Sequence, residues 1–353
     1  MAQVAGETAN PMGLKGVDFV EYAGPDSVYF EKLFVAYGFK RVGEIAGKKI
    51  SLYRQGHINF VINSEPGSFA LQFAKAHGPA ICSTGFKVKN AKAAYDLAVK
   101  RGGKPFKPSG VDSAWAPEWA IYGIGDSIVY FMDESASKKF DNEIFKVKPE
   151  DAAPRGLGFT IVDHFTNNVP KGEMQKWCDF YTKVFNFRET MYFDIKGKST
   201  GLISKVMRSP CGLFAVPINE PTDGKSQIQE YLDEYKGSGI QHVALLTDDI
   251  TKTLMALREN KLDFLPSPPG TYYRQLKDRL PAVSEDISTL EKNSILVDGD
   301  HDGYLLQIFS KNIIGPIFFE VIQRKGHDGF GNGNFQALFD AIEADQRERG
   351  YLT

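Results

Sequence analysis

Short apolar runs and amphipathic stretches follow one another along the chain, and the same order of elements occurs twice. The first half opens with an apolar strand candidate at 17–20, and the second half opens with one at 159–162. Apolar side chains then recur every three to four residues over 174–185, which predicts a helix with one buried face. The tetrapeptides 37–40 and 185–188 follow the helical stretch of each half and resemble one another. Both halves are therefore predicted to begin with equivalent strand–helix units.

A second similarity lies downstream in each half. Strand candidates occur at 58–62 and 213–216, and each half then shows another strand that leads into a helix. Asn90 and Asp248 stand where these helices would begin, and both residue types favour the N-cap position. A shift of 157 residues superimposes the two downstream units. The repeat predicts four βαβββ-like modules, two in each half.

A charged stretch of low hydrophobicity, 135–155, separates the two halves and predicts a connection between domains. A chain of 353 residues is long enough for two domains. The predicted division is residues 1–150 and residues 151–353.

Two histidines and one glutamate occupy related places in this repeat. His164 ends the first strand of the third module, and His242 opens the first strand of the fourth. Glu320 lies within the apolar strand candidate 317–322, where a lone carboxylate is costly to bury unless it is paired or bound to a metal. Two histidines and one carboxylate on rigid strands are typical of the facial triad of non-haem iron(II) oxygenases. Under the 157-residue shift Gly85 takes the place of His242, so the N-terminal half is expected to be a scaffold without metal.

Other motifs favour simpler interpretations. Zinc hydrolases with the same ligand types usually carry His-Glu-x-x-His on one helix, and the sequence lacks that motif. His57 and His77 belong to no ligand pattern and are interpreted as structural. The acidic run 298–303 begins like a calcium loop, but its twelfth position is Phe309, so a hairpin turn is predicted. The glycine-rich run 329–333 is predicted to be a flexible loop or hinge.

Composition excludes several classes of protein. A formal net charge of −2 gives no basic field for nucleic acid or an anionic membrane. No apolar run is long enough to span a bilayer, and the N-terminus shows no signal peptide. Three dispersed cysteines without a Cys-x-x-Cys fit a reducing compartment, so a cytoplasmic location is expected. The 26 phenylalanines and 15 tyrosines favour an aromatic-lined pocket.

Several segments occur in a characteristic order and spacing, namely 162–164, 217–221, 226–229, 239–244, 305–309, 319–324 and 329–335. Together they resemble the 4-hydroxyphenylpyruvate dioxygenase family over nearly the whole chain. This resemblance implies an α+β protein of the vicinal-oxygen-chelate fold. In that fold four βαβββ modules form two open β-barrels, with the helices outside and a C-terminal helix over the active site.

The resemblance also implies an activity, namely conversion of 4-hydroxyphenylpyruvate and O2 to homogentisate and CO2 in tyrosine catabolism. One Fe(II) per chain is expected, with His164, His242 and Glu320 as its ligands. The chain is expected to form a homo-oligomer, a dimer or a tetramer. The positions that match the catalytic residues of the family are Gln227, Gln241, Gln307 and Phe335. The positions that match its substrate-binding residues are Ser204, Pro217, Asn219, Phe309, Phe330, Asn334 and Leu338.

Two alternatives remain open from the sequence. The first is 4-hydroxymandelate synthase, a relative for which a smaller aliphatic residue would be expected in place of Phe335. The second is a metal-free ligand-binding protein of the same fold, against which the presence of all three ligands argues. The C-terminal segment is predicted to form a helix capped by Asn334. Its apolar face is predicted to consist of Phe335, Leu338, Phe339 and Ile342. We expect this helix to act as a lid over the iron.

Overall fold

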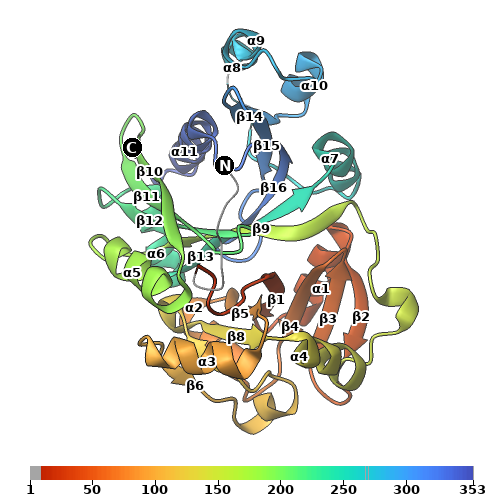
Figure 1. Ribbon diagram of the computed structural model, residues 1–353. Coiled ribbons are helices and arrows are strands. Elements are labelled where there is room, and N and C mark those ends of the chain that lie inside the picture. Colours follow the sequence, from red (N-terminus) through yellow and green to blue (C-terminus); the bar gives the residue numbers. More distant parts are fainter. Residues whose placement is uncertain (1–8, 267, 269, 353) are drawn as a thin grey trace.

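Two mixed eight-stranded sheets, one in each half of the sequence, form the framework of the protein (Figure 1). The computed structural model describes residues 9–266, 268 and 270–352. The strand orders are β2-β3-β4-β1-β5-β8-β7-β6 and β10-β11-β12-β9-β13-β16-β15-β14, so the two sheets share one topology. Each sheet joins two βαβββ modules, and the first strands of the two modules pair antiparallel at its centre. The predicted fold of four modules in two open barrels is confirmed.

The N-terminal sheet contains the first and second modules. The first consists of β1 (Gly16–Ala23), α1 (Ser27–Ala36), β2 (Lys40–Glu44), β3 (Ile50–Gln55) and β4 (Ile58–Asn63), followed by the connecting helix α2 (Phe69–His77). The second consists of β5 (Ala80–Lys87), α3 (Ala91–Lys100), β6 (Pro105–Phe106), β7 (Ala120–Tyr122) and β8 (Ile128–Met132), followed by α4 (Glu134–Lys139).

The C-terminal sheet contains the third and fourth modules. The third consists of β9 (Phe159–Asn168), α5 (Met174–Phe185), β10 (Arg188–Lys196), β11 (Gly201–Arg208) and β12 (Ala215–Pro221), followed by α6 (Gln227–Tyr235). The fourth consists of β13 (Gly239–Thr247), α7 (Ile250–Glu259), α8 (Gly270–Arg274), α9 (Leu276–Arg279), α10 (Ile287–Lys292), β14 (Leu296–Gly299), β15 (Tyr304–Phe309) and β16 (Phe318–Lys325). The C-terminal helix α11 (Asn332–Glu348) follows.

The hydrogen-bond registers correct the predicted alignment of the repeat. Glu21 pairs with Ser83 between β1 and β5, and Thr166 pairs with His242 between β9 and β13. In both sheets this pair is the last of three consecutive pairs, and a shift of register lies on each side of the three. Ser83, and not Gly85, is therefore the equivalent of His242, and the shift is 159 residues. The prediction was off by two because a slip of two residues keeps every side chain on the same face of a strand.

Helix starts agree with the corrected register. The Asn90 side chain accepts a hydrogen bond from the Ala93 amide at 2.8 Å, as its predicted N-cap role requires. In the equivalent helix the cap is Asp249, which accepts from the Lys252 amide at 3.0 Å, so the prediction of Asp248 was wrong by one residue. Boundary residues of this kind are ambiguous in sequence because two adjacent aspartates can each cap.

The stretch 135–155 does more than connect the halves. It contains most of α4 and a following turn, and Phe140 and Phe145 within it are buried against the N-terminal sheet. Phe140 stacks on Phe19 with ring centroids 5.3 Å apart. The predicted hairpin turn at 298–303 is confirmed, because β14 and β15 pair antiparallel on either side of it.

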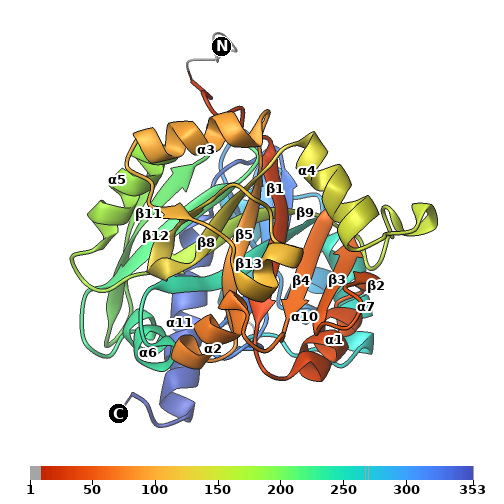
Figure 2. The ribbon, with the colours of Figure 1, turned by 90° about the horizontal axis from the view of Figure 1, so that it is seen from below.

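Helix α11 lies across the opening of the C-terminal barrel. The edge strands of that sheet are β10 and β14, and α11 contacts both of them as well as α6 (Figures 1 and 2). Its first residue is Asn332, and Gly331 occupies the N-cap position. Asn334 therefore lies in the first turn and is not the cap that the sequence predicted. Its side chain has other partners, described below.

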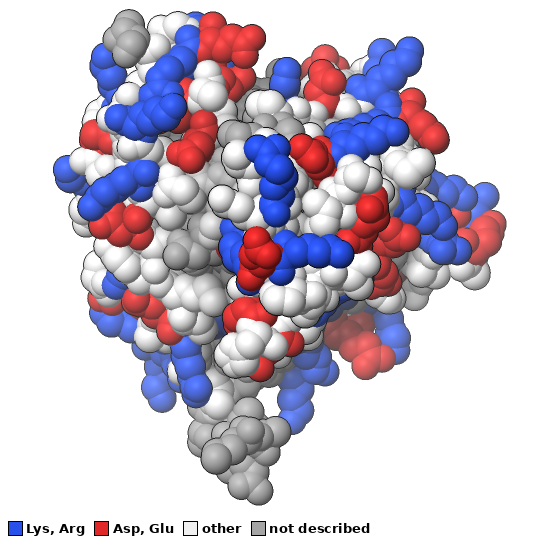
Figure 3. All heavy atoms as spheres, turned by 90° about the horizontal axis from the view of Figure 1, so that it is seen from above, with Lys and Arg blue, Asp and Glu red and all other residues white. Residues whose placement is uncertain are grey.

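Charges of both signs share the surface. On the face shown in Figure 3, lysine and arginine side chains are interspersed with aspartate and glutamate. This face presents no extended field of one sign. Among the described residues, no helix has both the length and the apolar character that a membrane span requires.

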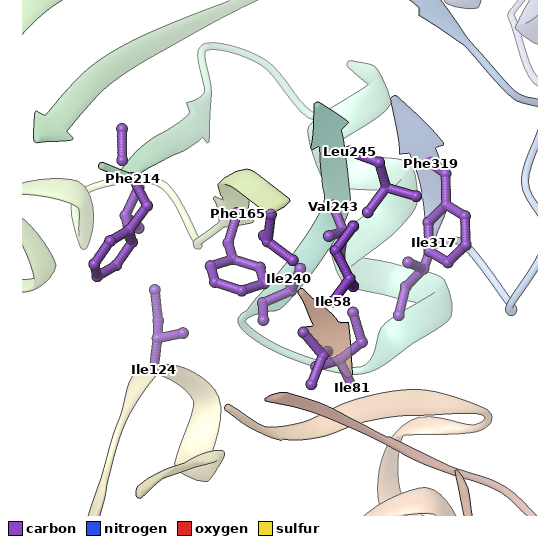
Figure 4. Close-up of a cluster of buried hydrophobic side chains, with 14 of the residues drawn as sticks. Ile58, Ile81, Ile124, Phe165, Phe214, Ile240, Val243, Leu245, Ile317 and Phe319 are labelled. Carbon is purple, nitrogen blue, oxygen red and sulfur yellow. The ribbon is translucent and has the colours of Figure 1, made fainter. Parts of the chain in front are cut away.

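A core shared by the two halves holds the central strands in place (Figure 4). Phe165, Val243 and Phe319 point toward the N-terminal half, where Ile58 and Ile81 face them. These three residues are sequence neighbours of His164, His242 and Glu320, one on each of β9, β13 and β16. Because side chains alternate along a strand, the same strands that bury apolar residues in the shared core present the polar triad to the opposite face.

Candidate metal centre and substrate pocket

The triad lies on three neighbouring strands of the C-terminal sheet. His164 pairs with Ala244 across β9 and β13, and Ala244 pairs with Glu320 across β13 and β16. His242 lies two residues before Ala244 on the same strand. The Nε2 atoms of His164 and His242 are 3.1 and 3.3 Å from Glu320 Oε2, and all three ligand atoms lie within 4.8 Å of one another. The three side chains are buried.

Two β-bulges shape this site. Val162 and His164 pair with consecutive residues of β13, which leaves Asp163 as an extra residue in β9. Ile240 and His242 likewise pair with consecutive residues of β9, which leaves Gln241 as an extra residue in β13. A bulge breaks strict alternation. As a result, Gln241 and His242 both line the pocket, and the Asp163 carboxylate reaches the ring of His164.

Asp163 fixes the protonation pattern of His164. Burial would raise the pKa of the Asp163 carboxyl, but Arg324 and His164 outweigh burial and hold this pKa well below its usual range. An ionised carboxylate only accepts hydrogen bonds, so His164 Nδ1, 2.8 Å from Asp163 Oδ2, is the donor. The Nε2 lone pair of His164 is therefore directed toward the centre of the triad, the usual arrangement for a metal-bound histidine.

Glu320 stays ionised although it is buried. Burial opposes its charge, but the two histidines lower its pKa from the ordinary 4.5 to about 2. Burial would likewise lower the pKa of His164, yet the carboxylates of Glu320 and Asp163 raise it. A divalent metal at this position would bind the carboxylate of Glu320 and the neutral form of both histidines.

The donor set and its dimensions fit a divalent transition metal. An octahedral metal with bonds of about 2.1 Å has neighbouring ligands about 3 Å apart. The two Nε2–Oε2 distances of 3.1 and 3.3 Å are close to this value. Two imidazoles with one carboxylate suit iron, and three ligands leave positions open for substrate.

The pocket above the triad gathers the residues expected from the sequence. Its empty volume is about 510 Å³, including the part open to solvent, which is within the usual range for ligand sites. All of the predicted site residues except Asn334 line it. The lining predicted residues are His164, Ser204, Pro217, Asn219, Gln227, Gln241, His242, Gln307, Phe309, Glu320, Phe330, Phe335 and Leu338.

Asn334 lies behind the pocket wall and supports it. Its Nδ2 donates to Gln307 Oε1 at 2.8 Å, and Gln307 Nε2 donates to Glu320 Oε1 at 2.8 Å. Tyr272 Oη donates to Asn334 Oδ1 at 2.7 Å and extends this chain. Gln307 was expected to be catalytic, and its side-chain amide hydrogen-bonds Glu320 and thereby orients this carboxylate. The first turn of α11 is connected to the candidate metal centre through the side-chain amides of Asn334 and Gln307.

Two polar side chains on neighbouring strands of the pocket each present an oxygen atom without a hydrogen-bond partner among the described residues. Ser204 and Asn219 pair directly across β11 and β12, so their side chains lie side by side. Ser204 Oγ and Asn219 Oδ1 are buried without a hydrogen-bond partner among the described residues. Buried polar atoms usually have partners, so these two are available to a ligand. Phe335, in edge contact with Phe193 at 5.2 Å, provides apolar wall nearby.

Sequence reasoning missed part of the lining and the support of His164. Because side chains two or four residues apart share one face of a strand, two of these residues could have been predicted. Thr166 lies two residues beyond His164, and Arg324 lies four residues beyond Glu320 on β16. Nothing in the local sequence marks Phe193. The lining residues that were missed are Thr166, Phe193, Leu202, Val206 and Ile228.

The N-terminal sheet differs at the equivalent positions. The paired registers align Phe19 with His164, Ser83 with His242 and Tyr130 with Glu320. None of these N-terminal side chains is a histidine or a carboxylate. The two bulges recur, at Asp18 and at Cys82, so the backbone of the site is repeated while its ligands are not.

The C-terminal half of the chain matches a superfamily of known proteins. Residues 161–308 match the family model described as the glyoxalase/bleomycin resistance protein/dioxygenase superfamily. A triple mutant of 4-hydroxymandelate synthase from Streptomyces coelicolor has the same fold. Its TM-score is 0.80 at 23% identity, and the alignment covers 95% of this chain and all of that one.

Residues 8–148 match the model of the N-terminal region of hydroxyphenylpyruvate dioxygenase. A 4-hydroxyphenylpyruvate dioxygenase of Legionella pneumophila (strain Philadelphia 1) is 47% identical, and the alignment covers 97% of this chain and 98% of that protein. Hemolysin VllY of Vibrio vulnificus is 46% identical, with 98% and 99% covered. The chain belongs to the 4-hydroxyphenylpyruvate dioxygenase family.

Proposed function

We propose that this protein is a non-haem iron(II) dioxygenase that converts 4-hydroxyphenylpyruvate and O2 to homogentisate and CO2 in tyrosine catabolism. The observation that carries the proposal is the cluster of His164, His242 and Glu320 within 4.8 Å at the wall of a pocket that also contains neutral amides and phenylalanines. Membership of the family supports the choice of substrate.

The three ligands would hold one Fe(II) per chain. When bound, iron(II) would supply chelation of the α-keto acid and activation of dioxygen. With two neutral imidazoles and one carboxylate the centre has a net charge of +1, which favours an anionic substrate. The Asp163 charge is compensated by Arg324 and does not change this balance.

Residues of the chain would orient and shield the substrate. Ser204 Oγ and Asn219 Oδ1 have no hydrogen-bond partner among the described residues and would hydrogen-bond the phenol. Gln227 and Gln241 would add neutral amide contacts that do not compete for the metal. Phe309, Phe330 and the α11 residues Phe335 and Leu338 would exclude water from the reacting atoms.

The proposal also assigns different roles to the two halves of the chain. Residues 151–353 would contain the whole iron site, and residues 1–150 would be a scaffold and subunit surface. The recurrence of the bulges without the ligands at Phe19, Ser83 and Tyr130 supports this assignment. A homo-oligomer and a cytoplasmic location remain predictions.

Anaerobic addition of Fe(II) and 4-hydroxyphenylpyruvate to the protein tests the metal site. A visible charge-transfer absorption from the iron–keto-acid complex is expected, and a metal-free ligand-binding protein would not give it. Glu320→Gln, which removes the only anionic ligand, should lose this absorption. His57→Ala, outside the site, is the control and should keep it. Stoichiometric iron and normal turnover in Glu320→Gln would refute the triad.

Chromatography of the products after admission of oxygen separates the two enzyme candidates. Homogentisate is the product expected here, whereas 4-hydroxymandelate as the main product would establish the synthase instead. Both reactions consume one O2 and release one CO2, so oxygen uptake alone does not distinguish them.

A further inference from the structure

The Arg324 side chain is the most extensively bonded cation near the proposed metal centre. It extends from β16 on the same face as Glu320, and only 14% of its side chain is exposed. Its Nε and Nη2 donate to Asp163 Oδ1 and Oδ2 at 2.7 and 2.8 Å, a bidentate pair. Asp163 in turn accepts from His164 Nδ1. Arg324 thus acts on the ring of a proposed ligand from the side opposite the metal.

The same guanidinium also holds the loop before α11. Arg324 Nη1 donates to the backbone oxygens of His327 at 3.0 Å and Gly329 at 2.7 Å. Its guanidinium carbon lies 5.5 Å from the centroid of the Phe330 ring. The Phe330 ring in turn contacts the His164 ring, with the ring centroids 4.8 Å apart and an angle of 66° between the ring planes. The loop that Arg324 holds therefore also touches the proposed ligand.

The second histidine is held differently. His242 Nδ1 is buried and has no hydrogen-bond partner among the described residues. The ring of His242 instead stacks on Phe318 at 4.7 Å. Of the two proposed histidine ligands, His164 is the one whose orientation depends on a charged network that also reaches the loop of Phe330.

We propose that Arg324 is a positioning residue that couples the orientation of His164, through Asp163, to the loop that carries Phe330 into α11. This inference rests on the metal site proposed above. Coupling is reciprocal, so metal bound by His164 should order the loop, and an ordered loop should tighten metal binding. Lysine cannot replace Arg324 fully, because one ammonium group cannot form the bidentate pair and also reach two carbonyl oxygens.

Co(II) titration of the metal-stripped full-length protein tests the first part of the coupling, namely the effect of Arg324 and Asp163 on metal binding. The visible Co(II) bands report the geometry of the ligands. Arg324→Gln and Asp163→Asn should each weaken Co(II) binding by about 10- to 100-fold and shift these bands. The double variant should bind about as weakly as Asp163→Asn alone, because both residues act on His164 along one path. Arg324→Lys should recover part of the affinity.

Arg208→Gln is the matched control. Arg208 donates to the Asp328 backbone oxygen in the same loop and lies 6.0 Å from the Phe330 ring, but no hydrogen bond joins it to Asp163. Its loss should leave the Co(II) bands unchanged. Near-ultraviolet circular dichroism checks that each variant is folded, and Asp163→Asn keeps the test decisive if Arg324→Gln does not fold.

Hydrogen–deuterium exchange tests the second part of the coupling, namely the effect of bound metal on the loop. Co(II) should slow amide exchange over 327–335 in the wild-type protein and should have no such effect in Arg324→Gln. Wild-type Co(II) affinity in Arg324→Gln, or equal protection of the loop in both proteins, would overturn the coupling alone. Failure of the wild-type protein to bind Co(II) would overturn the metal site itself.

Discussion

Glu21 occupies, in the N-terminal sheet, the position that Thr166 has beside the proposed metal centre. Its Oε1 accepts from Asn63 Nδ2 at 2.8 Å, and its Oε2 accepts from Ser83 Oγ. Both partners are neutral, so neither balances a charge on this buried carboxyl group. Burial accordingly raises the pKa of Glu21 from the ordinary 4.5 to about 7.

This shift predicts that stability falls as the pH rises. The folded protein binds the Glu21 proton more tightly than the unfolded chain, so its contribution is complete below pH 4.5 and is lost through about pH 7. Glu21→Gln should gain about 3 kcal/mol over wild type near pH 8 and less than about 1 kcal/mol near pH 5. Urea unfolding at both pH values measures this, with exposed Glu118→Gln as the control. A difference that does not change with pH would contradict the prediction.

Phe335 occupies the position at which a smaller aliphatic residue would be expected in a 4-hydroxymandelate synthase. It lines the pocket from α11 and packs edge-on against Phe193. Phe335→Ile should loosen the position of the substrate ring, so part of the product should become 4-hydroxymandelate or another misdirected compound. Product ratios under saturating oxygen measure this partition. Phe180→Ile, on α5 outside the pocket, should leave the ratio unchanged, and pure homogentisate from both variants would show that Phe335 only packs.

At the scale of elements, α11 is tied to its surroundings along its whole length. Asp298 Oδ2 accepts from the amides of Gly333 and Asn334 at its start. Glu343, in its middle, accepts from the backbone amides of 198–200 and from Thr200 Oγ1, at 2.9–3.1 Å. Arg349, just beyond its end, pairs with Glu230 of α6. A lid made of this helix would have to break these contacts before it could open.

Glu343 should therefore control how often the helix opens. Although burial favours the neutral form, the amide donors of the β10–β11 turn lower the pKa of Glu343, so the carboxylate is the form that binds this turn. Glu343→Gln should weaken this contact by about 2 kcal/mol, which corresponds to about 30-fold faster amide exchange over 332–348. Glu348→Gln, exposed at the end of the helix, is the control. Equal exchange in both variants would mean that Glu343 does not hold α11.

At the scale of the molecule, the two halves share one hydrophobic core. The centroid of the Phe319 ring lies 5.0 Å from that of Tyr37 and 5.8 Å from that of Phe60, both in the N-terminal half. Phe319 is also the residue before Glu320. Packing between the halves therefore helps to fix the strand that carries a proposed metal ligand.

Loss of Phe319 should destabilise both halves together. Phe319→Ala should cost about 3–5 kcal/mol. In a Trp177→Phe background the remaining tryptophans, Trp115 and Trp119, lie in the N-terminal half and report its unfolding in urea by fluorescence. The midpoint should fall although the substitution is in the other half. Exposed Leu213→Ala is the control, and an unchanged midpoint for Phe319→Ala would mean that the halves unfold independently.

Much of the fold could be predicted from the sequence. The period of apolar residues marks most strands and helices because it depends only on near neighbours. The repeat of these patterns gives the four modules, and the three ligand residues are chemically distinctive in their strands. The alignment of the repeat failed by two residues, since neither Gly85 nor Ser83 carries a pattern that fixes its cross-strand partner.

Residue types, the alternation of side chains along regular strands and the donor set of the candidate metal centre were thus determined by the sequence alone, because they depend on local order. Only the tertiary structure decided where this alternation is broken and which side chains from distant parts of the chain meet. The bulges at Asp163 and Gln241 arise from pairing between β9 and β13, and no local pattern specifies them. The Arg324–Asp163 pair joins residues that are 161 positions apart, and the position of Asn334 behind Gln307 depends on how α11 docks. Contacts of this kind are set by the packing of whole elements, which is why the support of the site emerged only from the folded chain.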